Sequence, residues 1–257
     1  MTAQPRPLAL VTGGHRRLGA RIAMHLASAG YALAVHGRFD AEPHRFLAER
    51  LAETGVEWAG FVADFLVPGE AEKLIPAVIA HFGRVPDLLV NSASLFGEGD
   101  LSTVGADELA AYHRVNTVAP VLLTQAFARA ERPAEQDAAI VNILDQRLAQ
   151  PHGDQLAYTL SKAGLEAFTR IAARTLAPAI RVNAVSPGLT LATYDYTPEQ
   201  IGRLAKLAPL ERLPEPEDVG AAVLYLARAR AVTGQTIIVD GGAHMRSYDR
   251  DFIHITD

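Results

Sequence analysis

A tyrosine and a lysine four residues apart are the residues of this sequence best suited to proton transfer. If their segment is helical, Tyr158 and Lys162 share one face, with their side chains one turn apart. A free tyrosine has a pKa of about 10, and an ammonium group nearby lowers that pKa by favouring the phenolate. The pair would then be a tunable proton donor. The same spacing also occurs on solvated helix faces, so the surrounding elements must decide between the two interpretations.

A carboxylate is the third candidate for this chemistry. Asp145 precedes Tyr158 by thirteen residues and directly follows the apolar run 139–144, which predicts a buried strand. Residues 156–176 show a helical pattern and include Tyr158 and Lys162. A carboxyl group at the end of the strand could relay a proton to or from the tyrosine. It could also simply cap the turn that follows the strand.

Short apolar runs alternate with helical patterns along the chain, and no low-complexity linker divides it. This alternation predicts a parallel sheet covered by helices on both faces. We therefore expect one Rossmann-like, doubly wound α/β domain over residues 1–257, with a seven-stranded, mainly parallel sheet. The predicted strands are 8–11, 31–36, 58–63, 87–90, 139–144, 180–185 and 236–239, and the predicted helices are 20–29, 42–54, 71–82, 106–130 and 156–176. Ligands of such sheets bind beyond the carboxyl ends of the strands.

The turn after the first strand is rich in glycine and arginine. Residues 12–19 read Thr-Gly-Gly-His-Arg-Arg-Leu-Gly, and their bare backbone N–H groups at a helix N-terminus favour a phosphate. The second strand runs into Gly37 and Arg38, where an acidic side chain would favour NAD. Arg16 and Arg38 instead suit the 2′-phosphate of NADPH, and Asp40 is the one discordant residue.

Composition restricts the possible functions. The 257 residues are 49% hydrophobic and 21% charged, with a net charge of −5, which is typical of a globular protein and argues against nucleic-acid or membrane-surface binding. The absence of cysteine excludes disulfides and thiolate chemistry, and we predict no metal site. No signal peptide or run of 18 apolar residues is visible, so a cytoplasmic location is expected.

Taken together, these motifs resemble the short-chain dehydrogenase/reductase family. The resemblance extends from about Leu8 to Gly242 and is carried by the turn 12–19, Asn91-Ser92-Ala93, Asn116, Tyr158-x-x-x-Lys162, the segment 181–188 and the segment 239–242. Two departures from the family pattern, Arg17 in place of a glycine and Asp145 in place of a serine, are features of its pteridine reductase branch. Ser94-Leu95-Phe96 also looks like a segment of that branch, although Ser92 and Leu95 depart from it.

The resemblance implies NADPH-dependent reduction of a dihydropterin to a tetrahydropterin. Its implied catalytic residues are Asp145, Tyr158, Lys162 and Asn116. Its implied cofactor-binding residues are Gly13, Arg16, Arg17, Leu18, Gly19, His36, Gly37, Arg38, Asp64, Asn91, Ser92, Ala93, Pro187 and Gly188. Its implied substrate-binding residues are Ser94, Phe96, Asp145, Tyr158 and Thr190. Two alternatives stay open: a carbonyl reductase of the same family that uses NADPH, and a catalytically silent NADP(H)-binding sensor.

Three further expectations concern the periphery. Residues 188–216 are predicted to form a substrate lid rich in Thr, Tyr and Pro, including Thr190, Thr193, Tyr194, Tyr196 and Pro198. The aromatic residues of this lid could cover a flat ring or could simply pack the lid on the body. The tail 243–257 could reach a neighbouring subunit's site, but a disordered end is the preferred interpretation. The helices at 106–130 and 156–176 resemble the pair through which the family forms tetramers, so a homotetramer is implied.

Overall fold

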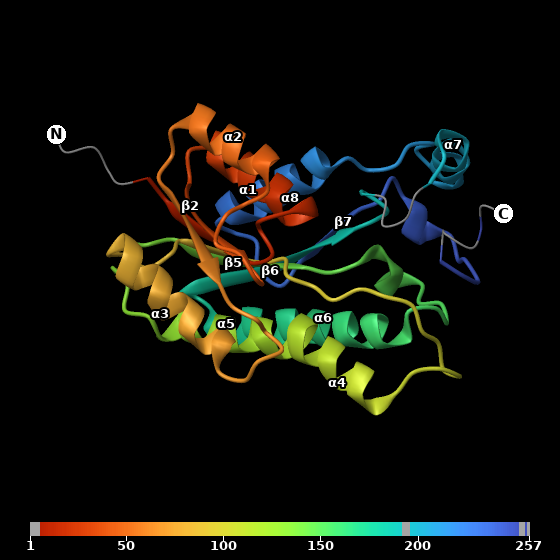
Figure 1. Ribbon diagram of the computed structural model, residues 1–257, viewed down its shortest axis with the longest axis horizontal. Helices are drawn as coiled ribbons and strands as arrows, with labels where there is room; N and C mark the ends of the chain where they lie inside the picture. Colours follow the sequence, from red (N-terminus) through yellow and green to blue (C-terminus); the bar gives the residue numbers. More distant parts are fainter. Residues whose placement is uncertain (1–5, 192–195, 252–254, 256–257) are drawn as a thin grey trace.

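A seven-stranded parallel sheet forms the middle layer of the protein in this computed structural model, which describes residues 6–191, 196–251 and 255 (Figure 1). The strand order is β3-β2-β1-β4-β5-β6-β7, and every neighbouring pair is parallel. The strands are β1 (Leu8–Val11), β2 (Ala32–Gly37), β3 (Trp58–Val62), β4 (Leu88–Asn91), β5 (Ala138–Ile143), β6 (Ile180–Pro187) and β7 (Thr236–Val239). The doubly wound fold that the sequence predicts is confirmed.

Helices cover both faces of the sheet (Figure 1). One layer contains α1 (Arg17–Ser28), α2 (Arg45–Thr54) and α8 (Pro216–Arg228), and the other contains α3 (Glu70–Phe82), α4 (Ala106–His113), α5 (Ala119–Arg129) and α6 (Leu156–Leu176). Alternate residues of β1 therefore enter two hydrophobic cores: Ala9 and Val11 enter the core beneath α1 and α8, and Leu8 and Leu10 enter the opposite one. This two-sided burial explains why the strands read as continuous apolar runs.

The predicted helix 106–130 is three segments rather than one helix interrupted at Pro120. A π-helical turn, Arg114–Val118, separates α4 from α5, and Pro120 occupies the first turn of α5. Ala119 donates its N–H to the Arg114 carbonyl five residues back, and Pro120 follows with no N–H to donate to the preceding turn. The irregularity therefore comes before the proline, in a turn that carries Asn116. Single π-turns often mark functional positions in helices.

The periphery differs from the expectation in two places. The lid segment contains a helix, α7 (Pro198–Leu207), which begins with a capping box formed by Thr197 and Gln200; Thr193 and Tyr194 lie outside the described residues. The prediction of a disordered tail is wrong for residues 243–251. They begin with a 3₁₀ turn and pack against the body, where the Tyr248 hydroxyl donates to the Leu207 carbonyl at 3.1 Å. None of the helices in the described ranges is long and apolar enough to cross a membrane.

Candidate active site

A cleft of about 530 Å³ opens at the carboxyl ends of the strands. It extends from the β1–α1 turn to Asp145 and Tyr158, so it joins the predicted phosphate-binding end to the predicted catalytic end. The site residues predicted from sequence that line the cleft are Gly13, Arg16, Arg17, Leu18, Gly19, His36, Gly37, Arg38, Asp64, Ser92, Ala93, Ser94, Phe96, Asp145, Tyr158, Lys162, Pro187, Gly188 and Thr190. Two predicted site residues, Asn91 and Asn116, are not among the described residues that line the cleft.

The β1–α1 turn is shaped by close approaches of the backbone. Gly13 has a φ of +62°, and a Cβ atom on Gly19 would lie 2.2 Å from the carbonyl oxygen of Gly13. Only glycine fits at Gly19, because the turn must double back on itself before α1 begins. The Thr12 hydroxyl accepts from the backbone N–H groups of Ser92 and Ala93 at 3.0 and 3.1 Å, and so ties the turn to the loop after β4. Thr12 begins the predicted phosphate-binding turn but is not among the residues predicted to bind the cofactor.

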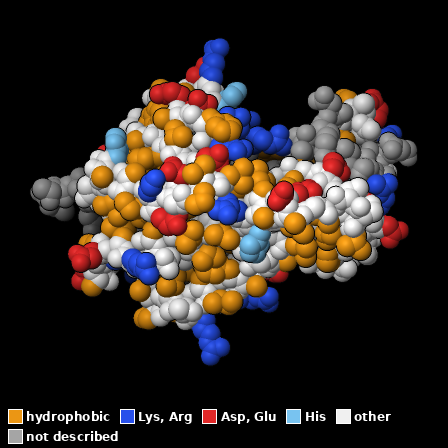
Figure 2. Space-filling view, turned by 60° about the horizontal axis from the view of Figure 1, so that its bottom comes forward, with side chains coloured by type: hydrophobic (Ala, Val, Ile, Leu, Met, Phe, Trp, Pro, Cys, Tyr) orange, Lys and Arg blue, Asp and Glu red, His pale blue; other side chains and the backbone are white. Residues whose placement is uncertain are grey.

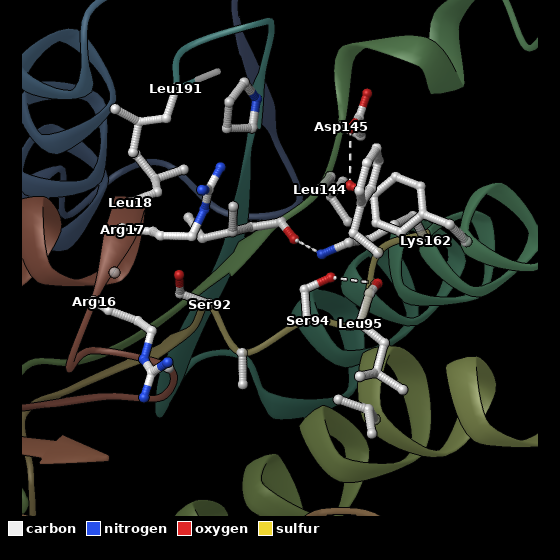
Figure 3. Close-up of a pocket in the computed structure, with 18 of the residues that line it drawn as sticks. Arg16, Arg17, Leu18, Ser92, Ser94, Leu95, Leu144, Asp145, Lys162 and Leu191 are labelled. Carbon is white, nitrogen blue, oxygen red and sulfur yellow. Dashed lines mark hydrogen bonds between the residues drawn. The ribbon is translucent and has the colours of Figure 1, made fainter. Parts of the chain in front are cut away.

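Arginine replaces the expected glycine in the middle of the same turn. Arg17 has a φ of +52°, a left-handed conformation that glycine adopts freely and arginine adopts at a cost. Figure 3 shows Arg16, Arg17 and Leu18 on the side of the cleft opposite Asp145 and Lys162. Backbone strain is often stored at functional sites. Here it places a cationic side chain on the cleft wall at the N-terminus of α1.

His36 and Arg38 lie at the end of β2 and differ in charge. The Nδ1 atom of His36 accepts from the Gly13 N–H at 3.1 Å, and its Nε2 atom lies 2.9 Å from the Ala63 carbonyl oxygen. Burial lowers the pKa of His36 to about 4, so the ring is neutral and serves the turn rather than supplying a positive charge. Arg38 forms an ion pair with Asp64 at 3.0 Å, and its side chain is 43% exposed. Arg38 is thus the accessible cation at this end of β2.

Tyr158 and Asp145 meet at the other end of the cleft. The Tyr158 hydroxyl donates to the Asp145 Oδ2 atom at 2.8 Å. Burial, together with the Asp145 charge, raises the pKa of Tyr158 well above 10. The expectation that a neighbouring ammonium lowers this pKa is therefore wrong for the protein alone. The reason is physical: the ring is only 6% exposed, and desolvation disfavours the phenolate. Tyr158 is a protonated donor.

Lys162 is buried directly behind Tyr158. Its side chain comes from the next turn of α6, its Nζ atom donates to the Ile143 carbonyl oxygen at 2.7 Å, and this atom lies 5.7 Å from the centre of the Tyr158 ring. Lys162 is 2% exposed, and burial lowers its pKa to about 8. The shared helix face that the spacing predicts is confirmed. An ammonium with so low a pKa titrates near physiological pH.

The two asparagines support the cleft from behind. In the π-turn, the Asn116 Oδ1 atom accepts from the Leu95 N–H at 2.7 Å, and its Nδ2 atom donates to the Leu95 carbonyl and the Ser161 hydroxyl, each at 2.9 Å. Asn91 donates to the Asn142 side chain at 2.8 Å and is 2% exposed. Both residues therefore order the loop or strand that carries cleft-lining residues.

Phe96 gives the catalytic end an aromatic wall. Its ring meets the Tyr158 ring edge-on, with centroids 4.9 Å apart and planes at 80°. Phe96 is 37% exposed, which leaves part of the ring available to a ligand. Ser94 uses its hydroxyl to donate to the Leu95 carbonyl at 3.1 Å, and the Thr190 hydroxyl donates to the Gly188 carbonyl at 3.0 Å. These two residues line the cleft but are bonded locally.

Several lining residues are absent from the sequence-based prediction. The most consequential are Arg147 and Asp251, which lie on the cleft wall at the catalytic end. Arg147 follows Asp145 by two residues, so its proximity could have been foreseen. Tyr196, an aromatic residue of the predicted lid, lines the cleft as well. No local signal identifies Asp251, because it reaches the cleft through the path of the C-terminal tail.

Comparison with known proteins agrees with this geometry. A sequence-family model described as enoyl-(acyl carrier protein) reductase matches residues 14–244. The solved structure of FolM alternative dihydrofolate reductase 1 from Brucella suis, in complex with NADP, superposes with a TM-score of 0.85 at 36% identity, covering 94% of this chain and 96% of that chain.

Two curated relatives carry different substrate names. Pteridine reductase 1 of Leishmania tarentolae is 35% identical over 284 residues, covering 94% of this chain and 98% of the relative. The 3-oxoacyl-(acyl-carrier-protein) reductase FabG of Staphylococcus epidermidis is 31% identical over 251 residues, covering 92% of this chain and 98% of the relative. These matches extend over nearly the whole chain and include the cleft. The protein is therefore an oxidoreductase of the short-chain dehydrogenase/reductase family.

Proposed function

We propose that the protein reduces a pteridine C=N bond with NADPH, converting a dihydropterin to a tetrahydropterin. The observation that carries the proposal is the 2.8 Å hydrogen bond from the Tyr158 hydroxyl to the Asp145 carboxylate. A carbonyl reductase needs a donor to the oxygen that gains charge, and a carboxylate does not serve that purpose. Reduction of a C=N bond places the proton on a ring nitrogen, next to which a carboxylate can relay a proton or accept from a pterin N–H.

The cofactor end of the cleft fits NADPH. Gly13 and Gly19 have no room for a side chain at their own positions. This bare backbone suits close approach of a pyrophosphate to the turn and to the start of α1. Arg16, Arg17 and Arg38 supply positive charge on the wall at this end. FolM of Brucella suis, which has the same fold, was solved with NADP. When bound, the cofactor supplies the hydride for the ring carbon.

The residues at the catalytic end would handle the proton. Tyr158, held protonated by burial and by Asp145, would donate to the ring nitrogen as the neighbouring carbon receives the hydride. Asp145 would orient the hydroxyl and relay the replacement proton, and Lys162 would supply positive charge behind the tyrosine. Phe96, with its partly exposed ring beside Tyr158, would stack on the flat pterin. Asn116 would hold the Leu95 backbone that carries Phe96 into the cleft.

Initial rates of NADPH oxidation across a substrate panel test the proposal. The panel contains several dihydropterins, an oxidised pterin, ketones, quinones and a 3-oxoacyl thioester, with NADH as the parallel cofactor. We expect turnover with dihydropterins and NADPH. Turnover with carbonyl compounds alone would contradict the proposal. NADPH binding without turnover of any compound would instead favour the catalytically silent sensor.

A carbonyl reductase is the second candidate, and the FabG relative favours it. It would use the same cleft, with Tyr158 donating to a carbonyl oxygen in place of a ring nitrogen. In that case Asp145→Ser should preserve or raise the rate with the carbonyl substrate. The same substitution should sharply lower the rate with a pterin.

We also propose a homotetramer. Figure 2 brings forward the face covered by α3–α6, where hydrophobic side chains gather on the surface. Val118 at the end of the π-helical turn is 38% exposed, and Leu160 and Ile171 on α6 are 53% and 63% exposed. Apolar surface of this kind on paired helices suits contact with further copies of the chain. Light scattering on the purified protein would check the mass, and a monomer would contradict this assembly.

A further inference from the structure

Arg147 is a buried cation beside the proposed proton donor. It lies in the 3₁₀ turn Gln146–Ala149 that follows β5, and only 5% of its side chain is exposed. Its backbone N–H donates to the Asp145 Oδ1 atom at 2.9 Å, and its Nε atom lies 3.4 Å from the same oxygen. The other carboxylate oxygen, Oδ2, accepts from Tyr158. Arg147 therefore occupies the side of Asp145 that Tyr158 leaves open.

The C-terminal tail approaches the other end of the same guanidinium group. The Arg147 Nη2 atom donates to the Asp251 Oδ2 atom at 2.5 Å. Asp251 is itself held by its backbone N–H, which donates to the Asp154 Oδ2 atom at 2.8 Å. Asp251 and Arg147 are 104 residues apart in the sequence, and both line the catalytic end of the cleft. Asp145 and Asp251 thus hold Arg147 between them.

This arrangement is a poor device for stability alone. The Nε and Nη1 atoms of Arg147 have no hydrogen-bond acceptor among the described residues, although both atoms are buried. Burying a charge with unused donors costs free energy, and buried ion pairs are weak evidence for stabilisation. Burial opposes the charge of Arg147, but the charges of Asp145 and Asp251 outweigh it and raise the pKa of this guanidinium. The charge at Arg147 therefore calls for a functional explanation.

We propose that Arg147 is a positioning residue that fixes Asp145 against Tyr158, and that Asp251 of the tail fixes Arg147. The inference rests on the proposed role of the Tyr158–Asp145 pair and applies whether the reduced bond is C=N or C=O. Its electrostatic consequence concerns Tyr158, whose ring centre lies 5.3 Å from the Arg147 guanidinium carbon. Burial and the Asp145 charge raise the pKa of Tyr158, and the Arg147 charge opposes that rise. Arg147 thereby limits how strongly the carboxylate holds the tyrosine proton.

Steady-state kinetics of Arg147→Met, Arg147→Lys, Asp251→Asn and the double variant Arg147→Met/Asp251→Asn test this inference. The substrate is whichever compound the parent enzyme reduces, so failure of the pterin proposal does not affect the outcome. We expect kcat to fall roughly 100-fold in Arg147→Met, because misplacing a catalytic group by about 1 Å costs this much. Asp251→Asn should lose about tenfold, and the Kd for NADPH should stay the same in every variant.

The double variant separates positioning from a merely structural role. If Asp251 acts only through Arg147, the double variant should be no slower than Arg147→Met alone. Arg147→Lys, which keeps the charge but loses the planar fork, should recover part of the rate. Asp249→Asn is the matched control, because Asp249 is exposed on the same tail and should keep the parent rate.

Each outcome decides for or against the proposal. A parent-like kcat in Arg147→Met or Asp251→Asn would overturn it, as would losses that multiply in the double variant. A lowered Tm without a fall in kcat would assign Arg147 a structural role only. If Arg147→Met does not fold, Arg147→Lys and Asp251→Asn apply the same criterion with smaller disturbance.

Discussion

The two ends of the cleft are built on opposite principles. At the cofactor end, backbone atoms approach closely around Gly13 and Gly19, the buried histidine is neutral, and the Arg38 charge lies near solvent. At the catalytic end, the Lys162 and Arg147 side chains carry their charges into the interior. The first end is shaped by sterics, and its cost is the left-handed backbone of Arg17. The second holds ionisable groups against desolvation, so its pKa values are shifted.

The cost in stability differs in kind between the two ends: backbone strain at Arg17 at the cofactor end, and desolvation of Lys162 at the catalytic end. Burying the Lys162 ammonium opposes folding and lowers its pKa, whereas the charges of Asp145 and Asp251 offset the burial of Arg147 and raise its pKa. The neutral His36 satisfies both of its ring nitrogens within the fold. Substitutions at the two ends should therefore differ in kind. Those at the catalytic end should change turnover, and some should stabilise the protein.

Tyr158→Phe should have the largest effect on turnover. The substitution removes the proposed proton donor and leaves the ring in place, so we expect the rate to fall by about 10³-fold. The cofactor end is untouched, and fluorescence titration should give an unchanged Kd for NADPH. Retained turnover would remove Tyr158 as the donor. A large loss of NADPH affinity would show that the two ends are not separable.

Asp145→Ser should have the second-largest effect on turnover, with a loss of roughly 10²-fold in kcat for pterin reduction. Serine cannot take up and pass on a proton as a carboxylate can, although it can still contact Tyr158. The matched control is Asp107→Ser, since Asp107 is exposed in the first turn of α4 and away from the cleft. Equal pterin rates in the parent and Asp145→Ser enzymes would rule out the relay.

Lys162→Met should lower turnover yet stabilise the protein at neutral pH. Burial lowers the pKa of Lys162 from 10.5 to about 8, so below pH 8 the folded state bears the cost of a buried charge. Allowing for the lost hydrogen bond to Ile143, we expect a gain of about 2 kcal/mol in the free energy of unfolding.

The stability difference between the parent and the Lys162→Met variant should depend on pH. Between pH 8 and about 10 the unfolded parent keeps the lysine proton that the folded parent releases, so parent stability rises with pH. The Met variant lacks this contribution, and the stability difference between the two proteins should therefore shrink over this range. Urea denaturation of both proteins at several pH values measures this difference in the free energy of unfolding. A difference that is constant from pH 7 to pH 10 would contradict the shifted pKa.

The sequence predicts those parts of the molecule that depend on local patterns. The bounds of α6 agree with the predicted helix 156–176, because its amphipathic repeat is long and uninterrupted. The strand–turn–helix segment at the cofactor end also follows from a local pattern, because an apolar run, a glycine-rich turn and an amphipathic repeat succeed one another there. The choice of Asp145 and Tyr158 as partners depended on strand-end placement and on resemblance. Their hydrogen bond now agrees with that choice.

The remaining features depend on tertiary packing that no local pattern encodes. The direction of the Tyr158 pKa follows from burial, which spacing along a helix does not specify. Asn91 lies at the end of β4, but its side chain turns to Asn142 and away from the cleft. Asp251 meets Arg147 only because the tail folds back over the body. Such contacts are set by the fold as a whole.

Arg38→Ala should have the smallest effect and should act only at the cofactor end. We expect the Kd for NADPH to rise about tenfold, because an exposed guanidinium interacts with a phosphate in a screened environment, while the Kd for NADH stays nearly constant. The ion pair with Asp64 sharpens the test. Asp64→Asn releases Arg38 and should tighten NADPH binding relative to NADH. If both cofactors weaken equally in Arg38→Ala, the 2′-phosphate lies elsewhere, and the arginines of the β1–α1 turn become the candidates.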